Sequence, residues 1–234
     1  MLILALDSTA TVGSVALCRD DVPLACFTVK NGNTHSETLL PMVEAVLRSA
    51  GVRATDVDLF ACSTGPGSFT GVRIGTATVK GLAFSREVCC LGVSTLEALA
   101  TNAIPTTALI CPVMNARRGQ LYNALFRFEN GTLVRETPDR AIAATELDEV
   151  LAKDGRPYLL VGDGVEEFLR HATKTAPEAI SPLLVDQCAT SVAKVAYARF
   201  LAGERGKDTD LNPTYLRMPQ AERERLERLQ EQAP

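Results

Sequence analysis

The stretch Ser63-Thr64-Gly65-Pro66-Gly67-Ser68-Phe69-Thr70-Gly71-Val72-Arg73-Ile74-Gly75 lies between an apolar run and a segment with helical periodicity. A strand, a glycine-rich loop and a helix in this order are the setting of an anion-binding loop. The spacing is neither that of a P-loop nor that of a Rossmann loop. Gly67, Gly71 and Gly75 lie four residues apart on one helical face, where another backbone can approach closely. Packing is therefore the favoured interpretation, and phosphate binding stays open.

Upstream of this loop, the sequence predicts three antiparallel strands and a helix. Residues 2–6 are apolar, and apolar runs return at 13–18 and 24–29 with turn signals between them. Strands joined by such short turns pair antiparallel. Leucine and valine then repeat at helical spacing over residues 39–50, and Gly51 marks the end of that helix.

Downstream of the loop, the sequence predicts crossovers between parallel strands. The strand at 57–62 leads through the loop into a helix that ends near Phe84, and residues 88–93 form the next strand. Ser94-Thr95-Leu96-Glu97 has the composition of a capped helix start. A strand that returns after a helix pairs parallel. The first half is therefore predicted to be α/β, with a mixed sheet of three antiparallel strands plus parallel strands, flanked by helices.

The second half repeats this order in degenerate form, without residue-level repetition. The predicted elements are strands at 109–113 and 120–128, an Asn130-Gly131 hairpin into 132–134, a helix at 145–152, a strand at 158–161, a Gly162-Asp163-Gly164 turn, and helices at 165–172 and 188–201. We therefore predict two similar domains, residues 1–105 and 106–217, followed by a charged tail, residues 218–234.

The composition is that of a globular protein with no overall affinity for nucleic acid. Apolar residues make up 46% and charged residues 22%, and the net charge is -4. Nucleic-acid-binding domains are usually basic, and with 5% aromatics and no Trp a base-stacking surface is not expected. The chain lacks an apolar run long enough to span a membrane. Its seven cysteines include no C-x-x-C, which favours free thiols and a cytoplasmic location.

Two groups of polar residues are candidates for chemistry. Asp7 ends the first strand beside Ser8 and Thr9. Such a carboxylate can hold a metal–phosphate or cap the turn after the strand, and the turn cap is the favoured interpretation. Arg117 and Arg118 lie at a predicted turn between strands. They can grip a phosphate or a partner carboxylate, or they form a solvated hairpin tip. The sequence leaves these two alternatives open.

Several segments together resemble one family. They are Gly65 to Gly75, His35-Ser36-Glu37 with Leu39-Leu40-Pro41, Ala116-Arg117-Arg118-Gly119 with Tyr122, Gly162-Asp163-Gly164, and Pro213-x-Tyr215-Leu216-Arg217. This pattern resembles the TsaB (YeaZ) family of the actin/hsp70/sugar-kinase-like superfamily and covers residues 1–217. The resemblance implies two actin-like (RNase H-like) domains. One departure is Asn115, where the family usually has Asp, so any role that needs a negative charge there is in question.

The resemblance also implies a function in tRNA modification. Members of the family help to make the threonylcarbamoyl modification of adenosine 37 in tRNAs that read codons beginning with A. The implied partners are a catalytic paralogue, TsaD, an ATPase, TsaE, tRNA only through the complex, and a second copy of this chain in isolation. TsaD holds its metal with two histidines on one helix, and this chain has no H-x-x-x-H. We therefore expect a non-catalytic subunit that has no metal site and requires no cofactor in isolation, with the interface of the complex as a candidate site for ATP or ADP.

In this family the helices of the first domain form the association surface. The expected partner interface comprises Leu39, Leu40, Val43, Val46, Leu47, Gly71, Gly75, Thr78, Val79 and Leu82. The candidate contacts to a nucleotide, a phosphate or a partner are Asp7, Ser8, Thr9, Gly65, Gly67, Arg117 and Arg118. A stand-alone actin-like ATPase or kinase is the alternative function. A peptidase is a third hypothesis, but the sequence has no Ser-His-Asp or H-E-x-x-H pattern to support it.

Overall fold

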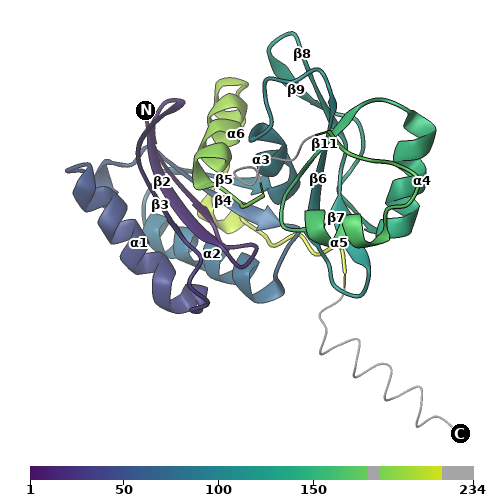
Figure 1. Ribbon diagram of the computed structural model, residues 1–234. Coiled ribbons are helices and arrows are strands. Elements are labelled where there is room, and N and C mark those ends of the chain that lie inside the picture. The colour runs from purple at the N-terminus through teal and green to yellow at the C-terminus, as the bar shows by residue number, and fades with distance from the viewer. Residues whose placement is uncertain (179–184, 218–234) are drawn as a thin grey trace, which may run out of the picture.

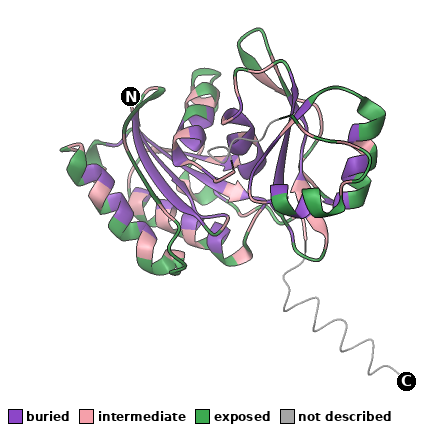
Figure 2. Cartoon of the chain, viewed as in Figure 1, coloured by how far each residue is buried: buried purple, intermediate pink, exposed green. Residues whose placement is uncertain are grey.

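The computed structural model describes residues 1–178 and 185–217, so the predicted charged tail lies outside the described residues. Two α/β halves lie side by side (Figure 1). Each half is built around one sheet, and buried residues line the sheets and the inner sides of the helices (Figure 2). The predicted fold class, two mixed sheets flanked by helices, is confirmed.

The first sheet has the strand order β3-β2-β1-β4-β5. Its strands are β1 (Leu2–Asp7), β2 (Gly13–Arg19), β3 (Val22–Val29), β4 (Leu59–Gly65) and β5 (Cys89–Ser94). The pairs β1–β2 and β2–β3 are antiparallel, and β1–β4 and β4–β5 are parallel. This is the predicted mixed sheet, and it places the carboxyl ends of β1 and β4 beside each other.

Helices cover both faces of the first sheet. Helix α1 (His35–Ser49) and α2 (Phe69–Ala83) pack on the face that carries Leu4 and Leu6. Helix α6 (Ala189–Leu201) packs on the opposite face, against Ile3 and Ala5. Successive side chains of β1 point to opposite sides of the sheet, so one apolar strand serves both clusters.

The position of α6 corrects the predicted domain boundary. The sequence places this helix at the end of the second domain, 106–217, but it packs against β1, β2 and β4 of the first sheet. The chain therefore returns to the first half after β11 (Figure 1). Leu211, which follows the short 3-10 helix Asp208–Asp210, is also buried in the first half.

The second sheet has the order β10-β7-β6-β8-β9, with β11 parallel to β6. Its strands are β6 (Leu109–Asn115), β7 (Gln120–Asn123), β8 (Phe126–Glu129), β9 (Thr132–Arg135), β10 (Arg140–Ala143) and β11 (Tyr158–Val161). The flanking helices are α4 (Ala144–Asp154) and α5 (Val165–His171), and a 3-10 helix, Ala54–Asp56, precedes β4 in the first half. The Asn130-Gly131 turn joins β8 to β9 as predicted, with φ of 52° and 77°.

One predicted strand is divided in two. Residues 120–128 were expected to form a single strand, but β7 ends at Asn123 and β8 begins at Phe126. The buried Asn123 amide donates to the carbonyl oxygens of Pro112 and Ala124 at 3.1 and 3.0 Å. The backbone N–H of Leu125 donates to Thr137 Oγ1 at 2.8 Å, so it is unavailable to a strand ladder.

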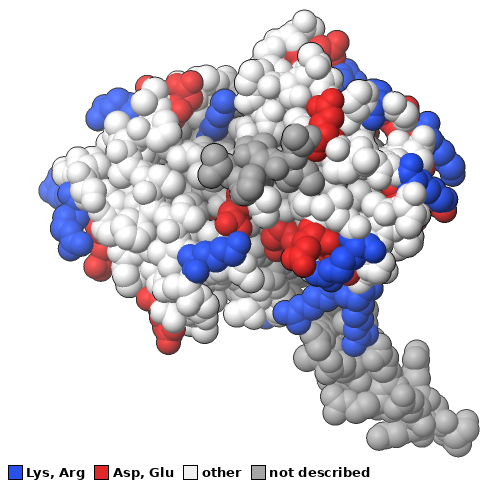
Figure 3. All heavy atoms as spheres, in the orientation of Figure 1, with Lys and Arg blue, Asp and Glu red and all other residues white. Residues whose placement is uncertain are grey.

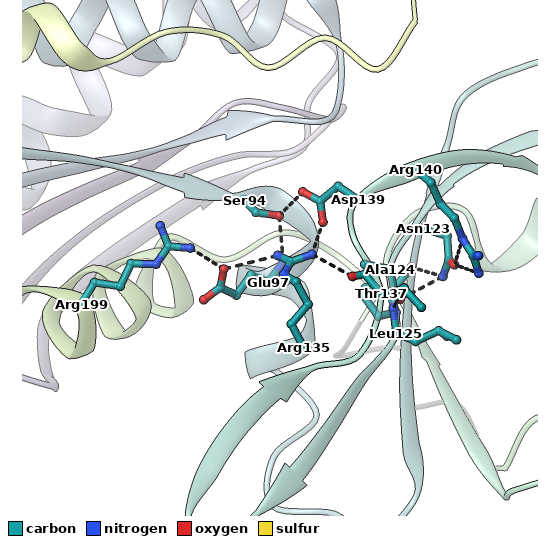
Figure 4. Close-up of polar contacts among 11 residues, drawn as sticks. Ser94, Glu97, Asn123, Ala124, Leu125, Arg135, Thr137, Asp139, Arg140 and Arg199 are labelled. Carbon is teal, nitrogen blue, oxygen red and sulfur yellow. Dashed lines mark hydrogen bonds and ion pairs between the residues drawn. The ribbon is translucent and has the colours of Figure 1, made fainter. Parts of the chain in front are cut away.

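The two halves are joined by helix α3 (Thr95–Thr101) and a polar network beside it (Figure 4). Glu97 of α3 accepts from Arg199 of α6 at 2.5 Å and from Arg135 of β9 at 3.4 Å. Asp139 also binds Arg135 and accepts from the Ser94 hydroxyl at 2.6 Å. Because Arg135 and Asp139 belong to the second half, these bonds hold the halves together.

Candidate functional site

The glycine loop packs tightly against the turn that follows β1. A Cβ atom built on Gly71 would lie 1.9 Å from the Ser8 carbonyl oxygen, and one on Gly75 would lie 2.7 Å from Ser8 Oγ. Ser8 Oγ in turn donates to the Gly71 carbonyl at 2.8 Å. The packing interpretation of these glycines is thus confirmed. Their expected place on a partner surface is wrong, because they are buried against their own chain.

The start of the loop is held in the same way. The Ser68 amide donates to the Thr9 carbonyl at 2.7 Å, and a Cβ atom on Gly67 would lie 2.5 Å from that same oxygen. The Ser68 hydroxyl caps α2 by accepting from the Gly71 amide at 3.2 Å. Two amides of the loop therefore have partners within the chain, which leaves fewer donors for a phosphate.

Asp7 is a buried turn cap, only 1% exposed. Its carboxylate accepts from the Thr9 amide at 2.9 Å, the Thr9 hydroxyl at 2.7 Å and the Ser63 hydroxyl at 2.5 Å. Burial raises its pKa above the ordinary value, although these hydrogen bonds act in the opposite direction. The favoured sequence interpretation, in which Asp7 caps the turn, agrees with this geometry.

Four of the segments that resemble the family meet at one cleft between the two halves. The cleft has a volume of about 1050 Å³. Its walls include Gly67–Thr70 from the glycine loop, Asn115–Arg118 at the end of β6, Asp163 after β11, and Thr214–Arg217 near the end of the described chain. Figure 3 shows Lys or Arg and Asp or Glu side chains close together near the lower centre of this face. The topology thus collects segments that are far apart in the sequence.

A strap formed by residues 213–217 ties the two sides of the cleft together. The Thr214 amide donates to the Thr64 carbonyl at 2.7 Å. The Tyr215 ring stacks on Phe69 with centroids 4.6 Å apart, and its hydroxyl accepts from Arg73 Nε at 2.8 Å. Arg217 donates to the Ala116 carbonyl in the second half. The strap therefore clamps the glycine loop of the first half to the Ala116–Gly119 turn of the second half.

Arg117 and Arg118 are exposed on a strained turn at the rim of the cleft. Both have positive φ, 64° and 58°, and Gly119 continues with 69°. Residues with a Cβ seldom adopt this conformation. The Arg117 amide donates to Asn115 Oδ1 at 2.7 Å, which supports the turn. Because the Asn115 oxygen performs this task without a charge, the departure from the family's usual Asp is structurally tolerated.

Asp163 is the half-buried acid of the cleft, and Gln187 is a neighbour that sequence reasoning missed. Burial raises the pKa of Asp163 to about 6. Within residues 1–178 and 185–217, neither Asp163 Oδ1 nor the polar atoms of the 2% exposed Gln187 side chain has a well-formed hydrogen bond. No sequence signal marks Gln187, since a single glutamine in an irregular segment has no motif.

The solvent-facing sides of α1 and α2 differ from the expected partner interface. Seven of its predicted residues are buried within this chain: Leu39, Val43, Val46, Leu47, Gly71, Gly75 and Val79. Leu40 is 52% exposed, and Thr78 and Leu82 are half-buried. The helical spacing located the apolar stripes but could not show that they face the chain's own sheet. The prediction is therefore corrected for these seven positions.

Some of the residues that are not buried on these helices have apolar or small side chains, and we call this subset the outer helix face. It comprises Leu40 of α1, and Ala77, Thr78, Gly81 and Phe84 at or just after α2. Ala77, Gly81 and Phe84 lie at i, i+4 and i+7, on one side of α2. Phe84 is 76% exposed, and a Cβ on Gly81 would have no atom within 4 Å.

The described parts of the chain contain neither a metal-binding cluster nor a membrane-spanning helix. No group of three or more His, Cys, Asp or Glu side chains among them is arranged to hold a metal ion. None of the helices in these same parts is both long and apolar enough to cross a membrane.

Comparison with known proteins shows the family. The family profile described as TsaD, tRNA N6-adenosine threonylcarbamoyltransferase, matches residues 30–222. The tRNA threonylcarbamoyladenosine biosynthesis protein TsaB of Bacillus subtilis (strain 168) is 32% identical over 97% of this chain and 99% of its own length. The chain belongs to the TsaB (YeaZ) family. The TsaB of Escherichia coli (strain K12) is 30% identical over 93% of this chain and 95% of its own length.

A solved structure from the same family has the same fold. YeaZ from Pseudomonas aeruginosa is 28% identical, with a TM-score of 0.82 over 92% of this chain and 99% of that chain. This TsaB-family chain thus has the actin-like fold that the sequence resemblance implies. Its four cleft segments are four of the five on which the sequence resemblance rests.

Proposed function

We propose that this chain is a non-catalytic subunit of the complex that transfers a threonylcarbamoyl group to adenosine 37 of tRNAs that read codons beginning with A. It acts by dimerising with a catalytic TsaD-type paralogue and by recruiting a TsaE-type ATPase. Family membership supports the pathway, since its relatives are named for tRNA threonylcarbamoyladenosine biosynthesis. The single observation that carries the dimerisation is the outer helix face, where apolar and small side chains face solvent.

The chemistry of the outer helix face suits a helical partner. Ala77 and Gly81 present almost no side-chain bulk, so another helix can approach the α2 backbone closely. Leu40 of α1 and Phe84 at the end of α2 are larger exposed apolar groups that lose exposed area on contact. A paralogue of the same fold offers a similar pair of helices. The two pairs then pack across a pseudo-two-fold axis.

The histidines support the non-catalytic assignment. The chain contains only His35 and His171, which lie on different helices. His35 Nε2 is hydrogen-bonded to the Ala10 carbonyl at 2.7 Å, so its ring is committed to holding the β1–β2 turn. His171 is the last residue of α5 and is exposed beside Glu167. These two rings cannot form the paired ligand set of the catalytic paralogue.

Association with the TsaD homologue of the same organism tests the proposal. The homologue and this chain are mixed and their affinity is measured by calorimetry, with the stoichiometry checked by light scattering. Gly81→Arg adds a long side chain where the folded chain has open space, so we expect an unchanged melting temperature and an affinity lower by at least about tenfold. Leu201→Asp, at the 67% exposed position on α6, is the matched control and should bind normally. Equal affinity for Gly81→Arg and the parent chain would contradict the proposal.

In isolation, the chain is expected to form a homodimer through the same face. An isologous surface can be used by a paralogue of like fold, so the homodimer and the heterodimer should exclude each other. Adding the TsaD homologue to the homodimer should therefore give a heterodimer and no larger species. The opposite result would be a stable assembly in which two copies of this chain touch through the outer helix face while a TsaD homologue is also bound. Such an assembly would show that the homodimer and the heterodimer use different surfaces.

The alternative function, a stand-alone ATPase or kinase, rests on the cleft. Its volume and the rim arginines Arg117 and Arg118 suit a phosphorylated ligand. The buried Asp7 and the loop amides that bind the chain itself argue against it. We propose that ATP or ADP, if bound, lies at the interface of the complex. Titration of the isolated chain with Mg-ATP separates the two functions, because micromolar binding and turnover would favour the ATPase.

A further inference from the structure

Two cysteines that are far apart in the sequence meet where α6 begins. Cys26 lies on the edge strand β3, and Cys188 immediately precedes α6. Their side chains interact, because each thiol is the largest single cause of the pKa shift of the other. Ser14 connects the same two segments, because its Oγ lies 4.0 Å from Cys26 Sγ and accepts from the Ala189 amide at 3.0 Å.

The surroundings of Cys188 stabilise a thiolate. It occupies the N-cap position of a 13-residue helix, where the helix dipole favours negative charge. Its sulfur lies 2.9 Å from Thr190 Oγ1. The hydrogen bond from the Cys26 thiol has the largest effect and holds the pKa of Cys188 below the ordinary value. The Thr190 hydroxyl and the backbone amides of Thr190 and Ser191 act in the same direction. The same contact raises the pKa of Cys26, so Cys26 keeps its proton.

We propose that Cys26 and Cys188 form a peroxide-reactive thiol pair that closes to a disulfide. The Cys188 thiolate attacks one oxygen of hydrogen peroxide, the O–O bond breaks, and hydroxide leaves and takes up a proton, which gives a sulfenic acid. The Cys26 sulfur then attacks the Cys188 sulfur, the S–O bond breaks, and the departing hydroxide leaves as water with the Cys26 proton. Overall, two thiols and one peroxide give one disulfide and two waters.

Three of the other cysteines are less suited to react with peroxide than this pair. Cys18 and Cys111 are buried, and burial raises their pKa to about 11 and about 12. Burial also raises the pKa of Cys62. These thiols stay protonated and shielded, and protonated thiols are poor nucleophiles. Cys26 is exposed and Cys188 is half-buried, so peroxide can reach the pair.

The disulfide would fasten the edge strand of the first sheet to the segment that returns from the second half. The Lys30–Asp186 ion pair, at 2.8 Å, already joins these two segments two residues before Cys188. Gln187, next to Cys188, lies beside Asp163 of the cleft. Oxidation would therefore fix the position of one crossing between the halves, close to the cleft.

Oxidation of the purified full chain tests this inference. The chain is treated with hydrogen peroxide, and non-reducing peptide mapping follows the Cys26–Cys188 cross-link together with the loss of two hydrogens from the intact mass. Dimedone should trap a sulfenic acid on Cys188 in the Cys26→Ser variant. We expect Cys188 to react about tenfold faster than the half-buried Cys89. Cys89→Ser is the matched control and should leave the cross-link unchanged.

Three results would overturn the inference. They are an unmodified Cys188 after Cys89 has reacted, a cross-link from Cys188 to Cys18 in place of Cys26, and equal reactivity of Cys188 in native and urea-unfolded chains. The last comparison uses the parent chain alone, so the test does not depend on the folding of a variant.

Discussion

Gly71 of α2 touches the backbone of Ser8 so closely that a methyl group on Gly71 would lie 1.9 Å from the Ser8 carbonyl oxygen. This contact joins the family's glycine signature to the turn after β1. It explains the glycine without any ligand, because no residue with a Cβ fits unless the helix moves away from the turn.

Gly71→Ala should therefore destabilise the chain by about 2 kcal/mol or more, since overpacking at a rigid backbone contact has no flexible neighbour to absorb it. Gly81→Ala in the same helix is the matched control. Its Cβ meets open space, so higher helix propensity should stabilise the chain by about 0.5–1 kcal/mol. Urea unfolding of the two variants measures the change in the free energy of unfolding, which should be a loss for Gly71→Ala and a gain for Gly81→Ala. A neutral Gly71→Ala would mean that the contact is looser than described.

Asp163 should make stability depend on pH. Burial raises its pKa from 3.8 to about 6, so the folded state favours the protonated form. Its contribution to the free energy of unfolding is fully present below about pH 4 and is lost as the pH rises through about 6. The Asp163→Asn variant should accordingly gain about 1–3 kcal/mol of stability over the parent chain between about pH 4 and about pH 8. A pH-independent difference between the two unfolding curves would show that the carboxyl is ordinarily solvated.

Tyr215 should hold the strap through its ring more than through its hydroxyl. The ring stacks on Phe69, and the hydroxyl accepts one bond from the exposed Arg73. Tyr215→Ala should cost about 1 kcal/mol, and Tyr215→Phe should cost less than about 0.5 kcal/mol. Thermal unfolding of both variants ranks the two effects. An equal loss of stability in both variants would show that the hydrogen bond of the hydroxyl, and not the stacked ring, holds the strap.

Arg117 and Arg118 should serve the complex and not the fold. Their side chains are exposed, and alanine has the same backbone restrictions as arginine at positive φ. The double alanine variant should keep its stability to within about 0.5 kcal/mol. Its support of tRNA threonylcarbamoylation by the reconstituted partners should fall. A large drop in melting temperature would show that the turn depends on these side chains.

The sequence predicts the local order of this fold better than its long-range packing. The strands around β1 and β4 follow from apolar runs and turn residues, and the Asn130-Gly131 hairpin follows from its turn chemistry. The apolar stripe of α6 has the same period whichever sheet it covers, so the return to the first half could not be predicted. The break between β7 and β8 depends on the bonds of Asn123 and Thr137, which join residues that no periodicity connects.

The candidate site shows the same limit. Glycines spaced four residues apart, at 67, 71 and 75, indicate a close backbone approach, but they do not show that Ser8 and Thr9 provide the approaching backbone. The cleft motifs are separately visible in the sequence, and only the fold shows that they line one surface. Cys26 and Cys188 meet across 162 positions of sequence, from 26 to 188, through the same return of α6.

The proposed role is best tested by the rate of tRNA threonylcarbamoylation by the TsaD and TsaE homologues as this chain is added. We expect negligible transfer by this chain alone and a rate that rises to saturation as the parent chain is added to the homologues. For Gly81→Arg, the half-saturating concentration should rise by about tenfold or more while the plateau rate is retained, because the variant alters only the outer helix face. Transfer activity by the chain alone, or an unchanged half-saturating concentration of Gly81→Arg, would show that the chain is not a non-catalytic subunit that binds through the outer helix face.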